Sequence, residues 1–251
     1  MKISKGRRLL ILGVVLVAID QVIKILVKTG MTIGEQFSVI PDWFRILFIE
    51  NEGMAFGMAF GGVAGKLLLS VFRIVLFGFL CWWITKLVRK GYGADGVPVV
   101  REDGAREVPA GVLAGLTLIT AGAFGNIIDS LFYGVLFSAS TPVEVASFGG
   151  HYAPFLFGKV VDMFYFPLFT WPSWVPFLGG HVFFEPVFNF ADSCVTCGAI
   201  YLILFQWRFF SREEKKEKGK GENKYIFISL QSRLEKCQSG RLGRTRNAVN
   251  G

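Results

Sequence analysis

The pattern of hydrophobic and polar residues divides the chain into four long apolar segments separated by polar or aromatic stretches. These segments cover about residues 9–27, 67–88, 110–128 and 193–210. A helix that crosses the hydrocarbon core of a bilayer needs about 20 mostly apolar residues, and each segment is close to that length. The sequence therefore predicts an all-α membrane protein with four transmembrane helices.

The first apolar segment follows a basic start, as the apolar part of a secretory signal peptide does. No small-x-small cleavage site comes after it, and the segment continues past Asp20 and Lys24. We therefore interpret it as an uncleaved first span.

The segments between and beyond the spans predict a small sheet, a long loop and a tail. Gln36–Glu50 mixes apolar and polar residues, which favours a short sheet on the membrane surface. Residues 129–192 form a long loop, whose stretch Phe169–Phe177 is as rich in Trp as the headgroup level of a membrane. Residues 211–251 are polar and basic, so we expect a mobile tail after a membrane-embedded domain of residues 1–210.

Composition and charge agree with a membrane protein. Hydrophobic residues make up 52% of the chain and charged residues 18%, against about 25% charged in soluble domains. The net charge of +8 does not predict a nucleic-acid partner, because Lys and Arg cluster beside the apolar segments. Four precede the first span, five lie at or after the end of the second, and twelve lie at or beyond the end of the fourth. By the positive-inside rule both termini and the loop 89–109 are cytoplasmic.

Charged residues in or beside a span are costly and usually functional. Asp20 and Lys24 are four residues apart and share a helix face, where a structural ion pair is as good an interpretation as a functional one. Asp129, Asp162 and Asp192 fall near the predicted outer edge. They converge at one depth if the third and fourth spans pack side by side.

Converging carboxylates favour peptide hydrolysis without a metal or cofactor. Two of them about 3 Å apart in a low-dielectric site share one proton. The ionised member can take a proton from water while the protonated member polarises the scissile carbonyl. A membrane carrier could use the same residues to relay protons or cations, and carboxylates can also bind a metal.

Other hydrolases are less well supported. No HExxH motif occurs, and His151 and His181 lie in loops, which disfavours a zinc peptidase. Three serines near the spans have no obvious histidine partner; they are Ser130, Ser138 and Ser193. Small apolar packing is the favoured interpretation of Cys194 and Cys197, over a metal or redox site. An N-cap role would explain Asp192 but not the other two Asp residues.

Five segments, in this order, resemble motifs of the bacterial lipoprotein signal peptidases (signal peptidase II). They are Asp20-Gln21-Val22-Ile23-Lys24 for DQxxK, Asn51-Glu52-Gly53-Met54-Ala55-Phe56-Gly57 for NxGxAFG, Gly125-Asn126-Ile127-Ile128-Asp129 for GNxxDR, Val160-Val161-Asp162-Met163-Phe164 for VVDF, and Phe188-Asn189-Phe190-Ala191-Asp192-Ser193 for FNxADS. The resemblance covers about residues 10–210.

The resemblance implies an aspartic endopeptidase of the cell inner membrane, with its active site at the outer face and no cofactor. Its substrates would be prolipoproteins, which reach it through the membrane lipid and are cut just before a diacylglyceryl cysteine. It implies that Asp162 and Asp192 are the catalytic pair. Because Asp192 begins a helix, whose positive end favours a negative charge, we expect Asp192 to be the resting carboxylate and Asp162 the protonated partner. The implied supporting residues are Asp20, Lys24, Asn51, Gly53, Phe56, Asn126, Asp129 and Asn189, with no metal ligand.

The chain departs from the family pattern at two places. Ser130 stands where the motif has Arg, and our hypothesis is that Lys159 or Arg73 supplies a positive charge there. The outer loop is longer than usual, with insertions at about residues 136–157 and 166–186.

A carrier would need a polar path across the bilayer, which the uncharged third span and the lack of an inverted repeat disfavour. An inactive relative that binds lipid or an inhibitor is the third alternative.

Overall fold

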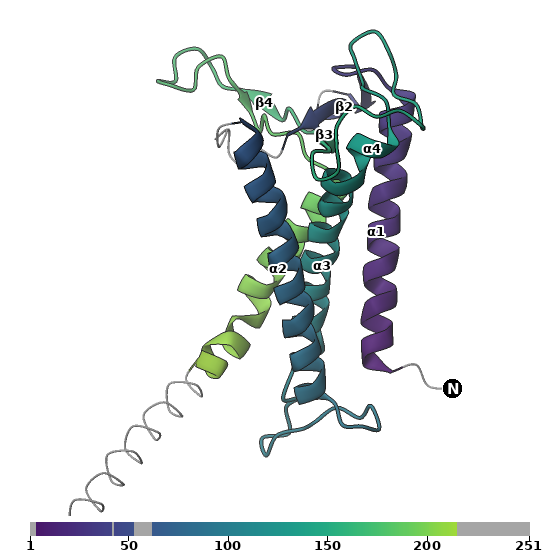
Figure 1. Ribbon diagram of the computed structural model, residues 1–251. Coiled ribbons are helices and arrows are strands. Elements are labelled where there is room, and N and C mark those ends of the chain that lie inside the picture. The colour runs from purple at the N-terminus through teal and green to yellow at the C-terminus, as the bar shows by residue number, and fades with distance from the viewer. Residues whose placement is uncertain (1–3, 42, 53–61, 215–251) are drawn as a thin grey trace, which may run out of the picture. The chain divides into compact units, whose positions relative to one another are not determined.

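The computed structural model describes residues 4–41, 43–52 and 62–214 of the chain (Figure 1). Gly53 and Phe56 of the predicted site lie outside these residues, as does the tail beyond Glu214. The chain divides into two compact units, Met1–Leu204 and Phe205–Gly251. The structure of the first unit carries all of the predicted site that is described.

Four helices of the described chain are long and apolar enough to cross a membrane, which confirms the predicted fold class. They are α1 Lys5–Gly30, α2 Gly62–Gly91, α3 Ala110–Ile128 and an unlabelled helix Phe190–Glu214. A π-helical turn, η1 Asp129–Tyr133, and the short α4 Gly134–Leu136 continue α3. The bounds of α3 are those predicted, whereas the other three helices are longer than the apolar runs that predicted them, because charged residues at their ends are also helical.

The third helix is the centre of the bundle. Both α1 and α2 pack on α3 and scarcely contact each other, and Figure 1 shows α3 behind and between them. Glycines on α3 permit close approach of the neighbouring helices. A Cβ added at Gly122 would lie 2.3 Å from the carbonyl oxygen of Ala191, and one at Gly125 would lie 2.5 Å from Asp20 Oδ2.

Gly122→Ala is therefore expected to destabilise the protein by about 1–3 kcal/mol, because the fourth helix must move away from α3. Thermal unfolding in detergent measures the effect as a lower Tm. Gly78→Ala is the matched control, since a Cβ at Gly78 on α2 meets nothing within 4 Å. Equal melting temperatures for the two variants would contradict the close packing described above.

A three-stranded antiparallel sheet lies at the end of the bundle where α1 ends. Its strands, in spatial order, are β1 Gln36–Ile40, β2 Phe44–Asn51 and β3 Val160–Tyr165. The first two confirm the short sheet predicted at Gln36–Glu50. The interpretation of residues 160–165 as loop was wrong, because this segment pairs with β2, more than 100 residues earlier. Nothing local in the sequence reveals such a partner.

Beneath the sheet lies a small hydrophobic core. It consists of Met31, Phe48, Tyr133, Phe137, Val161 and Met163. Because Val161 and Met163 are both fully buried, they fix the strand on which Asp162 lies between them. The insertion at about 166–186 contains a second, two-stranded hairpin, β4 Phe169–Thr170 and β5 Val182–Phe183.

Candidate active site

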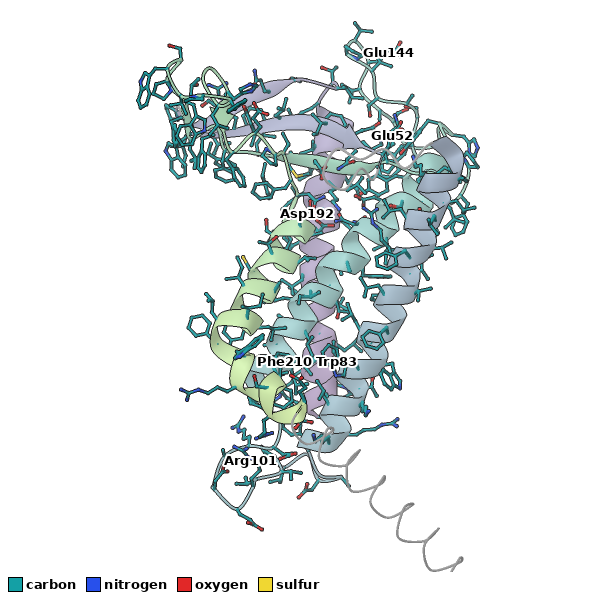
Figure 2. All side chains as sticks on the ribbon, turned by 90° about the vertical axis from the view of Figure 1, so that its left-hand side faces the viewer. Glu52, Trp83, Arg101, Glu144, Asp192 and Phe210 are labelled. Atoms are coloured by element: carbon teal, nitrogen blue, oxygen red, sulfur yellow. The ribbon has the colours of Figure 1, made fainter. Side chains whose placement is uncertain are left out.

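Asp162 and Asp192 come from different elements and contact the same asparagine. Asp162 lies on β3 and is 2% exposed, whereas Asp192 lies in the first turn of the helix Phe190–Glu214. The side-chain amide of Asn189 donates to Asp162 Oδ1 at 2.6 Å, and its backbone N–H donates to Asp192 Oδ2 at 3.3 Å. Figure 2 shows Asp192 at the end of the bundle that carries the sheet, with Arg101 at the opposite end.

The start of the fourth helix explains how Asp192 is oriented. Asn189 precedes the helix, and its Oδ1 accepts a hydrogen bond from the backbone N–H of Asp192 at 2.9 Å. The carboxylate of Asp192 accepts in return from Asn189, which makes a reciprocal capping box. The N-cap interpretation of Asp192 is thus corrected, since Asn189 caps the helix and Asp192 lies three residues later.

Two more asparagines contact the acidic pair. The Nδ2 of Asn51 donates to Asp162 Oδ2 at 3.2 Å, and the Nδ2 of Asn126 donates to Asp192 Oδ1 at 2.7 Å. Asn189 joins the two halves, because its Nδ2 also donates to Asn126 Oδ1 at 3.1 Å. The structure therefore brings together both acids and the three asparagines that the motifs named.

A buried ionic cluster lies next to these residues. The ammonium of Lys24 contacts Asp20 Oδ2 at 2.9 Å, Asp129 Oδ2 at 2.8 Å and Asn126 Oδ1 at 2.8 Å. All three charged side chains are at most 2% exposed. The predicted pair of Asp20 and Lys24 is present, and Asp129 extends it to a triad. A lysine removed from water needs such partners to remain charged.

The triad also fixes the backbone beside each acid. Asp20 Oδ1 accepts from the N–H of Ala191 at 2.9 Å, immediately before Asp192. Asp129 Oδ2 accepts from the N–H of Val161 at 3.3 Å, immediately before Asp162. The carboxylates thus link α1 and η1 to the two elements that carry the acidic pair.

Sequence reasoning missed several members of this polar network. Gln21 donates through Nε2 to both Asp20 and Asp129, and the hydroxyl of Tyr133 donates to Gln21 Oε1. Lys28, one turn beyond Lys24, is fully buried and pairs with Glu50. The four-residue spacing of charges at positions 20, 24 and 28 was the signal that could have found Lys28.

Of the two hypothetical replacements for the missing motif arginine, Arg73 is the one directed at position 130. Its Nη1 donates to Ser130 Oγ at 3.1 Å, and Ser130 Oγ donates to the carbonyl oxygen of Asn126 at 3.0 Å. Lys159 instead lies 3.2 Å from Glu52, at the surface. A guanidinium from α2 therefore contacts the side chain that stands where the motif has arginine.

Burial and the neighbouring Asp192, in that order, raise the pKa of the Asp162 carboxyl to about 7. Hydrogen bonds from Asn51 and Asn189 to the ionised form oppose the rise. At neutral pH Asp162 therefore exists in comparable amounts with and without its proton.

An apolar pocket of about 590 Å³ opens beside Asp192. It is lined by Phe44, Phe164, Phe166, Phe184, Pro186, Phe188, Asp192, Ser193, Thr196 and Cys197. The inserted loop contributes Phe166, Phe184 and Pro186 to this wall. Cys197 lies at the pocket whereas Cys194 is buried, and both are free thiols.

Comparison with known proteins identifies the family. A family model described as "Signal peptidase (SPase) II" matches residues 12–208. The chain belongs to the signal peptidase II family. The predicted family and the peptidase class are thereby confirmed, and nothing supports the carrier alternative. Family membership and the four apolar helices place the protein in the bacterial inner membrane.

Individual members of the signal peptidase II family are similar over most of the chain. The lipoprotein signal peptidase of Porphyromonas gingivalis is 48% identical, over 81% of this chain and 84% of its own. That of Amoebophilus asiaticus is 33% identical, over 75% of this chain and 72% of its own. A solved structure described as a bacterial membrane enzyme superposes with a TM-score of 0.51 at 26% identity, covering 80% of this chain and 93% of that one.

Proposed function

We propose that the chain removes signal peptides from prolipoproteins, cutting just before a diacylglyceryl cysteine, with Asp162 and Asp192 as the catalytic pair. The observation that carries the proposal is the contact of both carboxylates with Asn189, beside an apolar pocket. The relatives from Porphyromonas gingivalis and Amoebophilus asiaticus are lipoprotein signal peptidases by name, which supports the same substrate class.

The pair can catalyse hydrolysis by moving protons between water and substrate. Asp192 takes a proton from a water molecule as the water oxygen attacks the scissile carbonyl carbon. Asp162 gives its proton to the carbonyl oxygen, so that no oxyanion accumulates. The proton on Asp192 then passes to the leaving nitrogen, Asp162 takes one back from a hydroxyl, and the C–N bond breaks. The raised pKa of Asp162 supports its role as the acid.

The aromatic pocket suits the lipid part of this substrate. Its wall is rich in phenylalanine, and Asp192 lies at its edge. Acyl chains in the pocket would bring the modified cysteine to the acidic pair. The distribution of Lys and Arg supports cytoplasmic termini, and with them an active site at the outer face, where such substrates are exposed.

The function is tested by incubating the purified protein with a diacylglyceryl-modified prolipoprotein and following the mass of the product. We expect loss of the signal peptide from this precursor and no cleavage of the unlipidated one. Absence of cleavage of both precursors would contradict the proposed activity. Equal cleavage of both would contradict the role of the lipid.

Arg73 tests the electrostatics of the pair. Activity needs the proton on Asp162, so kcat/KM should fall as pH rises through about 7. Arg73 interacts electrostatically with Asp192 and Asp162. Removing its positive charge favours the protonated form of Asp162, so Arg73→Gln is expected to move this fall to higher pH. The pH dependence of kcat/KM measures the shift.

Arg73→Lys keeps the charge and should leave the fall near its wild-type position. Lys159→Ala should also leave it there, because Lys159 faces Glu52 rather than the acidic pair. If Lys159→Ala moved the fall in kcat/KM to higher pH as Arg73→Gln does, Arg73 would not be the specific source of positive charge at the acidic pair.

A further inference from the structure

A second groove lies between α1 and α2, over α3, and shares no lining residue with the pocket at Asp192. Its volume is about 710 Å³. It extends from Gly6 and Arg89 at one end to Ala18 and Phe77 at the other, with Phe124 of α3 in its floor. The groove exists because α1 and α2 both pack on α3 and scarcely contact each other (Figure 1).

The groove offers a hydrocarbon surface. Its three threonines donate their hydroxyls to carbonyl oxygens four residues earlier in their own helices: Thr85 to Cys81 at 2.8 Å, Thr117 to Leu113 at 2.7 Å and Thr120 to Leu116 at 2.7 Å. The hydroxyl hydrogens are thus used within the helices. A chain of methylene groups suits such a wall better than a polar ligand.

The length of the groove matches one leaflet of a bilayer. Twelve helical steps separate Gly6 from Ala18, which corresponds to about 18 Å. Half of the hydrocarbon core is about 15 Å thick. An acyl chain that enters at the membrane edge near Gly6 would therefore reach the bilayer midplane within the groove.

At its Gly6 end the groove opens into a basic pocket of about 950 Å³. The two cavities share Gly6, Val88 and Arg89. Four cationic side chains line the basic pocket, with Asp95 as its one acidic residue; they are Lys5, Arg8, Arg89 and Arg106. Within the described residues no carboxylate forms an ion pair with any of the four.

We propose that the groove and the basic pocket together bind one anionic phospholipid of the cytoplasmic leaflet. The acyl chain lies along α1 and α2, and the phosphate lies among the four cations. The positive pocket selects a negative headgroup, which the cytoplasmic leaflet supplies. It disfavours a substrate signal peptide, whose start is itself positively charged. The inference uses the orientation proposed above but not the catalytic assignment.

The test is native mass spectrometry of the purified full-length protein in detergent, titrated with palmitoyl-oleoyl phosphatidylglycerol. Palmitoyl-oleoyl phosphatidylcholine, with identical acyl chains, is the comparison lipid. We expect one phosphatidylglycerol to be retained at concentrations where phosphatidylcholine is lost. The double variant Arg8→Gln/Arg89→Gln should weaken this retention about tenfold or more.

Arg101→Gln is the control, because it also replaces an arginine by glutamine, in the neighbouring loop, and Arg101 lines neither cavity. It should retain the lipid as the wild type does. Val14→Trp fills the groove without changing charge, since Val14 lines it and is 59% exposed. Val14→Trp should lose phosphatidylglycerol too. If Val14→Trp does not fold, the Arg8→Gln/Arg89→Gln variant still tests the proposal.

Three results would overturn the proposal. Equal retention of the two lipids by the wild type would mean that lipid binds only non-specifically around the helices and not at the basic pocket. Unchanged retention by the Arg8/Arg89 variant would remove the headgroup site. A Val14→Trp variant that keeps the lipid but raises KM for prolipoprotein would assign the groove to the substrate. Cleavage is measured separately, so failure here leaves the proposed function standing.

Discussion

Asp162→Asn and Asp192→Asn are each expected to lower kcat for prolipoprotein cleavage by about 10²–10⁴-fold or more, the contribution typical of a positioned acid or base. Asparagine keeps the size of the side chain but can neither give up nor accept the proton that hydrolysis requires. Single-turnover cleavage of a lipidated precursor in detergent measures the loss.

The Asp192→Asn variant separates catalysis from helix capping. The capping contact that starts the helix is made by the Oδ1 of Asn189 with the backbone N–H of residue 192, which the substitution leaves in place. The amide oxygen of the substituted side chain can also accept from the Asn189 N–H. Helix stability should therefore be almost unchanged while cleavage is lost.

Asp103→Asn is a suitable control, because Asp103 lies in the loop that joins α2 to α3 and pairs with Arg101. It should cleave at the wild-type rate. Wild-type cleavage by either the Asp162 or the Asp192 variant, with an unchanged Tm, would remove that residue from the catalytic pair.

The sequence predicted the features of this molecule that depend on short segments. Each span follows from the apolar length of one segment, and the convergence of Asp162 and Asp192 follows from placing their motifs at one membrane edge. The strand that carries Asp162 could not be predicted in this way, because its partner β2 lies more than 100 residues earlier.

Contacts between helices were the other limit. Arg73 and Ser130 are 57 positions apart in the sequence, and no periodic signal pairs them. From the sequence, Lys159 was as good a candidate as Arg73 for the positive charge near position 130, but in the structure it pairs with Glu52. A side chain's sequence neighbours determine which helix face it occupies, but only the packing of α2 on α3 determines what that face meets.

Lys24 is expected to be the most sensitive charged residue outside the acidic pair. Lys24→Met fills much the same volume but leaves Asp20 and Asp129 buried without their cation. Breaking a buried ion pair from one side costs about 3–5 kcal/mol. For a chain of this size that corresponds to a fall in Tm of about 10 °C, which thermal unfolding in detergent measures. Lys86→Met, on the exposed surface of α2, should change Tm little.

The same substitution should also lower cleavage by the molecules that remain folded. Asp20 and Asp129 accept from the backbone beside Asp192 and Asp162, so relaxation of the triad displaces both acids. Adding Asp129→Asn to Lys24→Met removes one of the two uncompensated charges, and the double variant should melt higher than Lys24→Met alone. Strictly additive losses would mean that the two residues do not interact. The lysine would then have to stabilise the site through Asp20 and Asn126 only, and the strand carrying Asp162 would not depend on it.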